Sequence, residues 1–292
     1  QIISSSNIGG AEKLFFSLLK YLDKDEFEAY VACPPDGLMF KNFKKYAREI
    51  QTLNFNHLLL KPITIFSLKK YMQQKKIDIV HTHLFNADLA GIIAAKFAKV
   101  PCKITTIHGY NFSSTGEFDL RSIKNFFFSF IYRLVYLFCD NIIAVCQSIK
   151  QDLMQRPGIK VKEEKIKVIN SAIDLEEISN CNRDVNLDFK DLSVNNNTKF
   201  VGIIANLDKV KCHRILLRAI PQILKEEVKT KFLLVADGKE RKHLQRMTRR
   251  LRIEDNVIFL GLQEQVTCII SITYLIVLPS FFESRPLIIM VS

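Results

Sequence analysis

The chain has 292 residues, of which 48% are hydrophobic and 25% charged, and its net charge is +12. This composition excludes a disordered chain and is typical of a globular protein long enough for two domains. The longest apolar stretch, residues 126–138, contains Arg133 and is shorter than the roughly 20 residues that span a bilayer. We therefore expect at most a helix that lies on a membrane surface.

The positive charge is concentrated in the first part of the chain. Residues 1–172 contain 24 Lys and Arg against 15 Asp and Glu, and 24 − 15 gives +9. An anionic partner is one explanation: a phosphorylated or lipid-linked substrate, a membrane surface or nucleic acid. Solubilising lysines explain the charge equally well. The seven cysteines are scattered without metal-binding spacing, which predicts free thiols in a reducing compartment and no metal site.

Short apolar strands alternate with amphipathic helices along residues 1–172. A strand at Ile2 and Ile3 leads into a glycine turn and a helix. We predict further strands at residues 30–33, 77–81, 103–107, 141–145 and 165–169, and helices at residues 38–49, 66–75, 87–99, 121–138 and 148–154. Such alternation is typical of a parallel sheet covered by helices.

The alternation restarts after a polar, Asn- and Asp-rich segment at residues 175–197. Strands are predicted at residues 199–204, 231–236, 257–260 and 274–278, with helices at residues 215–224 and 243–251. The chain is thus α/β, with a domain at residues 1–172, a linker at 173–198 and a second domain at 199–292. We expect the first strand to lack its beginning and the last helix to stop early, which would make the chain truncated at both ends and its second domain incomplete.

Glycines mark the first turn between strand and helix. Gly9 and Gly10 precede the first helix, and glycines there let backbone amides approach an anion at the helix end. A tight turn, with Glu12 as a favourable first-turn acid, is the simpler interpretation.

Three histidines lie at strand ends in the first half. His81 and His83 flank Thr82 and should point the same way, because side chains two apart share one face of a strand. A metal site would need further ligands, which the sequence does not offer. His108 follows the strand at residues 103–107 and is placed to hydrogen-bond a sugar hydroxyl or a phosphate, or simply the backbone of its own loop.

Two loops in the second half carry charge where a strand ends. In residues 206–213, NLDKVKCH, Lys211 lies near a helix N-terminus, where a cation suits a diphosphate. In residues 278–292, LPSFFESRPLIIMVS, Glu283 stands between a strand and a helix that starts near Pro286. Ligands bind at such loops in open α/β sheets. Glu283 is a candidate for accepting sugar hydroxyls and also for capping the helix.

These motifs resemble, in order, those of glycosyltransferase family 4. Residues 279–286 are similar to its P-S-x-x-E-G-x-P motif, and residues 206–212 to its R-L-x-x-x-K-G loop. Further similarities are the following: residues 9–10 to its glycine loop, 78–83 to D-V-V-H-x-H, 108–109 to H-G, 170–174 to N-G-x-D, 236–241 to G-D-G-x-x-R and 256–261 to N-V-x-F-L-G.

The resemblance implies the GT-B architecture, two Rossmann-like domains facing across a cleft. It also implies transfer of a hexosyl-type sugar from a nucleotide-diphosphate donor to a glycan or lipid-linked acceptor, with retention at the anomeric carbon, and no metal or other cofactor. It assigns His108 and Glu283 to catalysis. The residues that it assigns to donor binding are Gly9, Gly10, Asn206, Lys211, Gly261, Pro286 and Leu287. We expect a cytoplasmic protein, peripheral at the inner membrane face.

The sequence departs from the family pattern on the donor side. Asn206 stands in place of the Arg, Cys212 and Ser284 in place of glycines, and Val291 in place of the second Glu. A non-catalytic or decayed relative is therefore an alternative hypothesis. A nucleic-acid-binding module is a remote one, because the net charge favours it but no recognition motif does.

Overall fold

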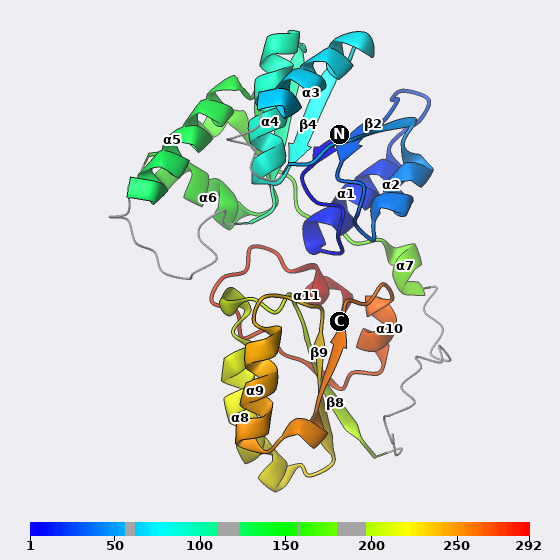
Figure 1. Cartoon of the computed structure of the whole chain (residues 1–292), viewed down its shortest axis with the longest axis vertical. Helices are drawn as coiled ribbons and strands as arrows, with labels where there is room; N and C mark the ends of the chain where they lie inside the picture. The colour runs from blue at the N-terminus through cyan, green and yellow to red at the C-terminus, as the bar shows by residue number, and fades with distance from the viewer. Residues whose placement is uncertain (56–61, 110–122, 157, 180–196) are drawn as a thin grey trace. The chain divides into compact units, whose positions relative to one another are not determined.

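The computed structural model describes residues 1–55, 62–109, 123–156, 158–179 and 197–292 (Figure 1). The chain divides into two compact units, the first ending at Ala172 and the second beginning at Ile173. Each unit contains a parallel sheet, one of seven strands and one of four. The predicted α/β class with two parallel sheets is therefore confirmed.

The first unit alternates strands and helices throughout. Its strands are β1 (Ile2–Ile3), β2 (Tyr30–Cys33), β3 (Glu49–Thr52), β4 (Ile79–His83), β5 (Cys102–Ile107), β6 (Asn141–Ala144) and β7 (Ile166–Val168). Its helices are α1 (Gly10–Tyr21), α2 (Phe40–Tyr46), α3 (Pro62–Gln74), α4 (Phe85–Ala98), α5 (Ile123–Phe138) and α6 (Gln147–Gln155).

The strand order of this sheet is β3-β2-β1-β4-β5-β6-β7. The chain winds outward in one direction from β1 to β3 and in the other from β4 to β7. The order reverses between β1 and β4, and open parallel sheets bind ligands at the carboxyl ends of the strands on either side of such a reversal. The glycine turn follows β1, and His83 ends β4.

A closely packed hydrophobic core lies beside the carboxyl ends of β1 and β4. Ile3 of β1, Phe15 of α1 and Phe43 of α2 are fully buried in one cluster. The rings of Phe15 and Phe43 meet edge to face at 4.8 Å, which is a favourable aromatic geometry. Phe15 also meets the ring of His83 edge to face at 5.1 Å. The core therefore holds one of the histidines that the sequence analysis identified.

The second unit repeats the plan in smaller form. After α7 (Leu175–Ser179) come the strands β8 (Lys199–Ile204), β9 (Thr230–Val235), β10 (Val257–Gly261) and β11 (Leu275–Ile276). The helices are α8 (His213–Glu226), α9 (Arg241–Leu251), α10 (Val266–Ser271) and α11 (Leu287–Val291). The strand order is β10-β9-β8-β11, so the reversal lies between β8 and β11.

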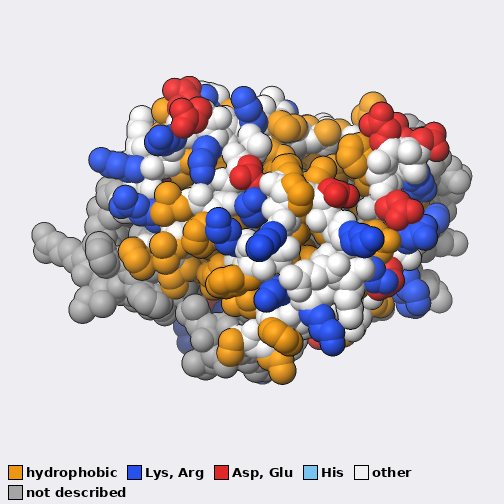
Figure 2. Space-filling view, turned by 90° about the horizontal axis from the view of Figure 1, so that it is seen from above, with side chains coloured by type: hydrophobic (Ala, Val, Ile, Leu, Met, Phe, Trp, Pro, Cys, Tyr) orange, Lys and Arg blue, Asp and Glu red, His pale blue; other side chains and the backbone are white. Residues whose placement is uncertain are grey.

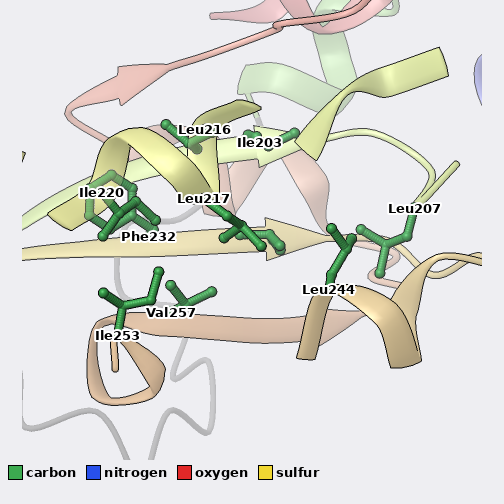
Figure 3. Close-up of a cluster of buried hydrophobic side chains, with 10 residues drawn as sticks. Ile203, Leu207, Leu216, Leu217, Ile220, Phe232, Leu244, Ile253 and Val257 are labelled. Carbon is green, nitrogen blue, oxygen red and sulfur yellow. The ribbon is translucent and has the colours of Figure 1, made fainter. Parts of the chain in front are cut away.

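Both faces of this second sheet are covered. On one face Phe232 and Leu234 of β9 pack with Leu217 of α8 and Leu244 of α9, all buried (Figure 3). On the other face Leu233 and Val235 pack with Ile269 and others. Successive residues of β9 thus serve opposite faces, as the period of two requires, and the strand is apolar at every one of these positions because both faces are dry.

The differences from the predicted elements have local causes. The helix predicted at residues 38–49 is shorter, because residues 49–52 form β3, an edge strand whose ends are exposed and which therefore lacks an apolar run. The strand predicted at residues 274–278 is reduced to β11, two residues long. Helices α7 and α10 were not predicted, being too short for a clear period. Residues 180–196 of the predicted linker lie outside the described residues.

Candidate functional site

The two charged loops of the second unit meet at its strand-order reversal. Lys211 lies in the loop after β8 and Glu283 in the loop after β11, and β8 and β11 are neighbours in the sheet. The Lys211 Nζ donates to Glu283 Oε1 over 2.7 Å. The side chains are only 28% and 24% exposed. Residues 72 apart in sequence thus form one partly buried ion pair where parallel sheets bind ligands.

Backbone contacts keep these two loops together. The amide of Phe281 donates to the carbonyl of Val210 over 2.9 Å. The short 3₁₀ turn at Lys209–Lys211 ends at Cys212, which has a left-handed backbone with φ +54° and is followed directly by α8. This conformation favours glycine, which is a physical reason for the family's glycine at this place. The Cys212 side chain is buried, and its thiol points to the carbonyls of Lys209 and Val210.

The turn after β9 is hydrogen-bonded to the loop after β8 that carries Lys211. Leu207 donates its amide to the carbonyl of Asp237 and accepts from the amide of Glu240, at 3.0 and 2.9 Å. A β-carbon on Gly238 would lie 2.5 Å from the Leu207 carbonyl oxygen, so only glycine fits there. Residues 236–238, part of the segment that resembles the G-D-G-x-x-R motif, therefore shape the loop that carries Lys211.

The other predicted donor residues of this unit lie in three segments. Asn206 is exposed and begins the loop. Gly261 ends β10, two strands away from β8, with φ +70° and its carbonyl accepting from the amide of Ala236. Pro286 and Leu287 are the N-cap and first residue of α11. The N-cap residue Pro286 makes no side-chain hydrogen bond to this helix, and the carboxylate of Glu283 accepts from Lys211.

In the first unit, Gly9 and Gly10 lie where α1 begins. Gly9 is the N-cap in an extended conformation, with φ −165°, and Gly10 is the first helical residue. A β-carbon on Gly9 would approach the carboxylate of Glu12. Glu12 is buried, and this burial raises its pKa. Glycine at position 9 therefore leaves room for a carboxyl group at the positive end of α1.

The three histidines form a connected cluster at the carboxyl ends of β4 and β5. His83 Nδ1 and His108 Nε2 are 2.9 Å apart, and His81 Nε2 lies 2.7 Å from the Thr106 hydroxyl. The rings of His81 and His83 are 4.3 Å apart, so they point the same way as predicted. Burial lowers the pKa of His81 to about 3 and that of His108 to about 4, and it lowers that of His83 as well. All three rings are therefore neutral at pH 7.

A buried carboxyl group lies beneath this cluster. The hydroxyls of Thr82 and Thr105 both donate to Asp88 Oδ1 over 2.7 Å, which ties β4 and β5 to the first turn of α4. Burial raises the pKa of Asp88 to about 7. Sequence reasoning missed this network. The signal was available, because Asp88 lies one turn into a helix that starts directly after the strand of Thr82.

Sequence reasoning also missed how the site residues pair. It singled out His83 and His108, and Lys211 and Glu283, but not that each couple is hydrogen-bonded. The pairing depends on which strands are neighbours, and β4 beside β5 and β8 beside β11 are facts of the sheet order. Among the residues that the structure describes, no group of three His, Cys, Asp or Glu side chains is arranged to hold a metal ion.

Comparison with known proteins identifies the family and the fold of the chain. A family model described as Glycosyltransferase Family 4 matches residues 8–177, and one described as Glycosyl transferases group 1 matches residues 198–291. The crystal structure of Anabaena HepE in complex with UDP-glucose matches with a TM-score of 0.72 at 20% identity, covering 97% of this chain and 74% of that one. This likeness shows a shared fold.

Curated relatives match along nearly the whole chain. UDP-Gal:alpha-D-GlcNAc-diphosphoundecaprenol alpha-1,3-galactosyltransferase of Escherichia coli is 25% identical over 291 residues, covering 97% of this chain and 73% of the relative. N-acetyl-alpha-D-glucosaminyl L-malate synthase of Bacillus anthracis is 26% identical over 301 residues, with the same two coverages. With a family model matching more than half of its length, the chain belongs to glycosyltransferase family 4 and is a glycosyltransferase that takes its sugar from a nucleotide sugar.

Proposed function

We propose that this glycosyltransferase moves a hexose from a nucleoside-diphosphate donor to a lipid-linked saccharide, with retention at the anomeric carbon. The observation that carries the proposal is the Lys211–Glu283 pair at the strand-order reversal of the second unit. The lipid-linked acceptor is suggested by the E. coli relative, whose name specifies a diphosphoundecaprenol acceptor. Because such an acceptor is anchored in a bilayer, the reaction would take place at a membrane surface.

The two side chains have complementary roles in this proposal. Lys211 binds the diphosphate and stabilises the negative charge that grows on it as the glycosidic bond breaks. Glu283 accepts hydrogen bonds from sugar hydroxyls. Without ligand the two side chains neutralise each other, so neither charge is left unpaired in this half-buried place. Donor binding then exchanges one ion pair for a cation–phosphate contact and carboxylate–hydroxyl bonds.

In the first unit, the proposal assigns roles to His108 and to the N-terminal end of α1. We assign His108 to the transferred sugar, as a neutral hydrogen-bonding ring whose orientation is held by His83. Gly9 and Gly10 offer backbone amides at the start of α1, which suits a phosphate. Asn206, Gly261, Pro286 and Leu287 are proposed donor contacts of the second unit.

Calorimetry on the Lys211→Ala variant tests the donor site. Removing Lys211 should weaken the binding of UDP and UDP-sugars by about 1.5–3 kcal/mol, the range for a hydrogen bond to a charged group. Lys225→Ala is the matched control, because Lys225 is an exposed lysine in the last turn of α8. It should bind like the wild type.

The titration is run with UDP, GDP and their sugars. Absence of binding by the wild type at millimolar ligand would refute the donor site and favour a non-catalytic relative. If Lys211→Ala bound the nucleotides with unchanged affinity, Lys211 would not be part of the donor site. The anomeric configuration of a product made from an α-linked donor, read by NMR, tests retention.

A further inference from the structure

Helix α5 is apolar on two opposite sides. Its inner side is buried in the first unit and consists of Ile131, Tyr132, Val135 and Tyr136. On its outer side Phe130 is 52% exposed, Leu134 39%, Leu137 59% and Phe138 36%, and Arg133 is the only polar residue among them. The spacing 130, 133, 134, 137, 138 places these side chains on one face of the helix. An amphipathic helix normally presents polar side chains to water there.

The apolar face continues onto the end of α4. Helices α4 and α5 pack against each other. Phe97 of α4 is 62% exposed, and the Lys96 ammonium lies 5.6 Å from the centre of the Phe138 ring. We call Phe97, Phe130, Leu134, Leu137 and Phe138, with Lys96 and Arg133, the α5 surface. Several large apolar side chains in one place are more than the scattered exposure that needs no explanation.

The described charged side chains on the helices around this surface are mostly basic. On α3, α4 and α5 they are Lys69, Lys70, Lys96 and Arg133, against a single acid. That acid is Asp88, which is 1% exposed and bonded to Thr82 and Thr105. The nearby carboxylate of Asp140 pairs with Lys103 at 2.8 Å. Figure 2 shows one face of the molecule, on which hydrophobic side chains gather with Lys and Arg side chains, and also Asp and Glu side chains, between and around them.

We propose that the α5 surface docks the protein on an anionic phospholipid bilayer. The four exposed apolar side chains of α5 and Phe97 would enter the boundary between headgroups and acyl chains. Arg133 and Lys96 have long side chains that reach the phosphates while their stems stay in the apolar layer. Among the described helices none is long and apolar enough to cross a membrane, so this binding is interfacial.

Charge favours lipid over a second copy of the chain as the occupant. A symmetric dimer through this surface would bring Arg133 and Lys96 of both copies together without an exposed acid from α3, α4 or α5 to balance them. An anionic bilayer provides the balancing negative charge. Each Lys or Arg near such a surface contributes about 1 kcal/mol of attraction, which is about fivefold in binding. The choice of a bilayer rests in part on the proposed function, whose acceptor is lipid-linked.

Vesicle co-sedimentation tests the apolar part of the surface. The full chain is incubated with vesicles of phosphatidylcholine mixed with phosphatidylglycerol, and with pure phosphatidylcholine. The double variant Leu134→Ser/Leu137→Ser should lose about tenfold or more in partitioning to the mixed vesicles, because two large side chains no longer leave water. The control is Ile215→Ser/Val228→Ser, which replaces two exposed apolar residues of the second unit and should bind like the wild type.

The Arg133→Gln variant tests the electrostatic part separately. It should lower binding to the mixed vesicles about fivefold and leave binding to pure phosphatidylcholine unchanged, because only the anionic surface attracts the charge. Added salt should have the same selective effect. Since Arg133, Leu134 and Leu137 are exposed, these variants should keep the circular dichroism of the wild type.

Three outcomes would overturn the proposal. One is equal binding of wild type and the double variant to mixed vesicles, and another is absence of wild-type binding to them. The third is a wild-type dimer that the double variant converts to a monomer, seen by light scattering, which would identify a second copy as the occupant. UDP binding measured on the same samples keeps the two proposals apart: intact UDP binding without vesicle binding refutes the α5 surface alone.

Discussion

At the scale of single residues, candidate site residues form one hydrogen-bonded pair in each unit. Lys211 bonds Glu283, and His83 bonds His108. Contacts of this kind contribute little to the free energy of folding when they are exposed to water. Here the side chains are partly or fully buried, so breaking a contact would leave an unsatisfied polar group. These hydrogen bonds hold the polar groups in fixed orientations, which in the proposed function lowers the free-energy cost of reorganisation when the donor binds.

The pH dependence of stability should report on His81. Because burial lowers its pKa from 6.5 to about 3, the unfolded chain takes up a proton between these values and the folded chain does not. This contribution to stability is present above about pH 6.5 and is lost as the pH falls toward 3. Between about pH 7 and about pH 5, wild type should lose about 2 kcal/mol more than His81→Gln in urea denaturation.

The comparison with a variant is necessary because Asp88 acts in the opposite direction. Its raised pKa of about 7 makes the folded state bind a proton more tightly, so its contribution falls as the pH rises from about 4 to 7. Exposed His243→Gln is the matched control and should keep the wild-type pH dependence. Identical pH profiles for wild type and His81→Gln would show that His81 titrates normally.

At the scale of elements, the loop that carries the candidate residue Lys211 is held in place by a turn that carries no candidate residue. The loop after β8 carries Lys211, but its path is set by Leu207, which is buried and bonded to the turn after β9. That turn also contains Ala236 with φ +103°, a conformation that costs free energy for any residue except glycine. The site thus depends on backbone geometry from a neighbouring strand.

Gly238→Ala should therefore damage both stability and donor binding. The new methyl group would lie within 2.5–2.8 Å of three Leu207 backbone atoms, and backbone cannot move aside cheaply. We expect a loss of about 1–3 kcal/mol in the free energy of unfolding, as for overpacking, and weaker UDP binding, because the loop leading to Lys211 must shift.

Gly202→Ala is the matched control for this substitution. A β-carbon there would meet only the Thr273 side chain, at 3.2 Å, so a smaller loss of stability and normal UDP binding are expected. Denaturant titration and calorimetry measure both quantities. If Gly238→Ala bound UDP as tightly as the wild type, the turn at Gly238 would not influence the donor site.

At the scale of the whole molecule, the two units have separate sheets and separate cores. The cluster around Phe15 and Phe43 belongs to the first unit, and the clusters around Phe232 and Leu233 to the second. Both residues of the proposed donor pair lie in the second unit. A nucleotide without its sugar should therefore stabilise this unit more than the first, whose proposed phosphate contacts are only the backbone amides of Gly9 and Gly10.

Hydrogen exchange with and without UDP tests this expectation. At about 100 times the dissociation constant, a ligand stabilises the state that binds it by about 2.7 kcal/mol. Amides of β8 and β9, which exchange by unfolding of the second unit, should then be protected about 100-fold, and those of β1 and β4 should change little. Equal protection in both units would mean that they unfold together or that both contribute equally to nucleotide binding.

Local patterns in the sequence were sufficient for most elements and for the family. The strand predicted at residues 199–204 coincides with β8, because a strand buried on both faces is a continuous apolar run. The motif order was enough to indicate glycosyltransferase family 4. Prediction failed where burial is one-sided or the element is short, as for the edge strand β3 and the six-residue helix α10.

The sequence by itself thus determined the α/β class and the family, and it indicated which side chains are candidates for the chemistry, because these depend on local periodicity and on motif spacing. Only the tertiary structure decided which of them meet. Lys211 reaches Glu283, and His83 reaches His108, because β8 lies beside β11 and β4 beside β5. Strand order is a property of the packed sheet, since hydrogen bonds between strands join residues that the chain keeps far apart.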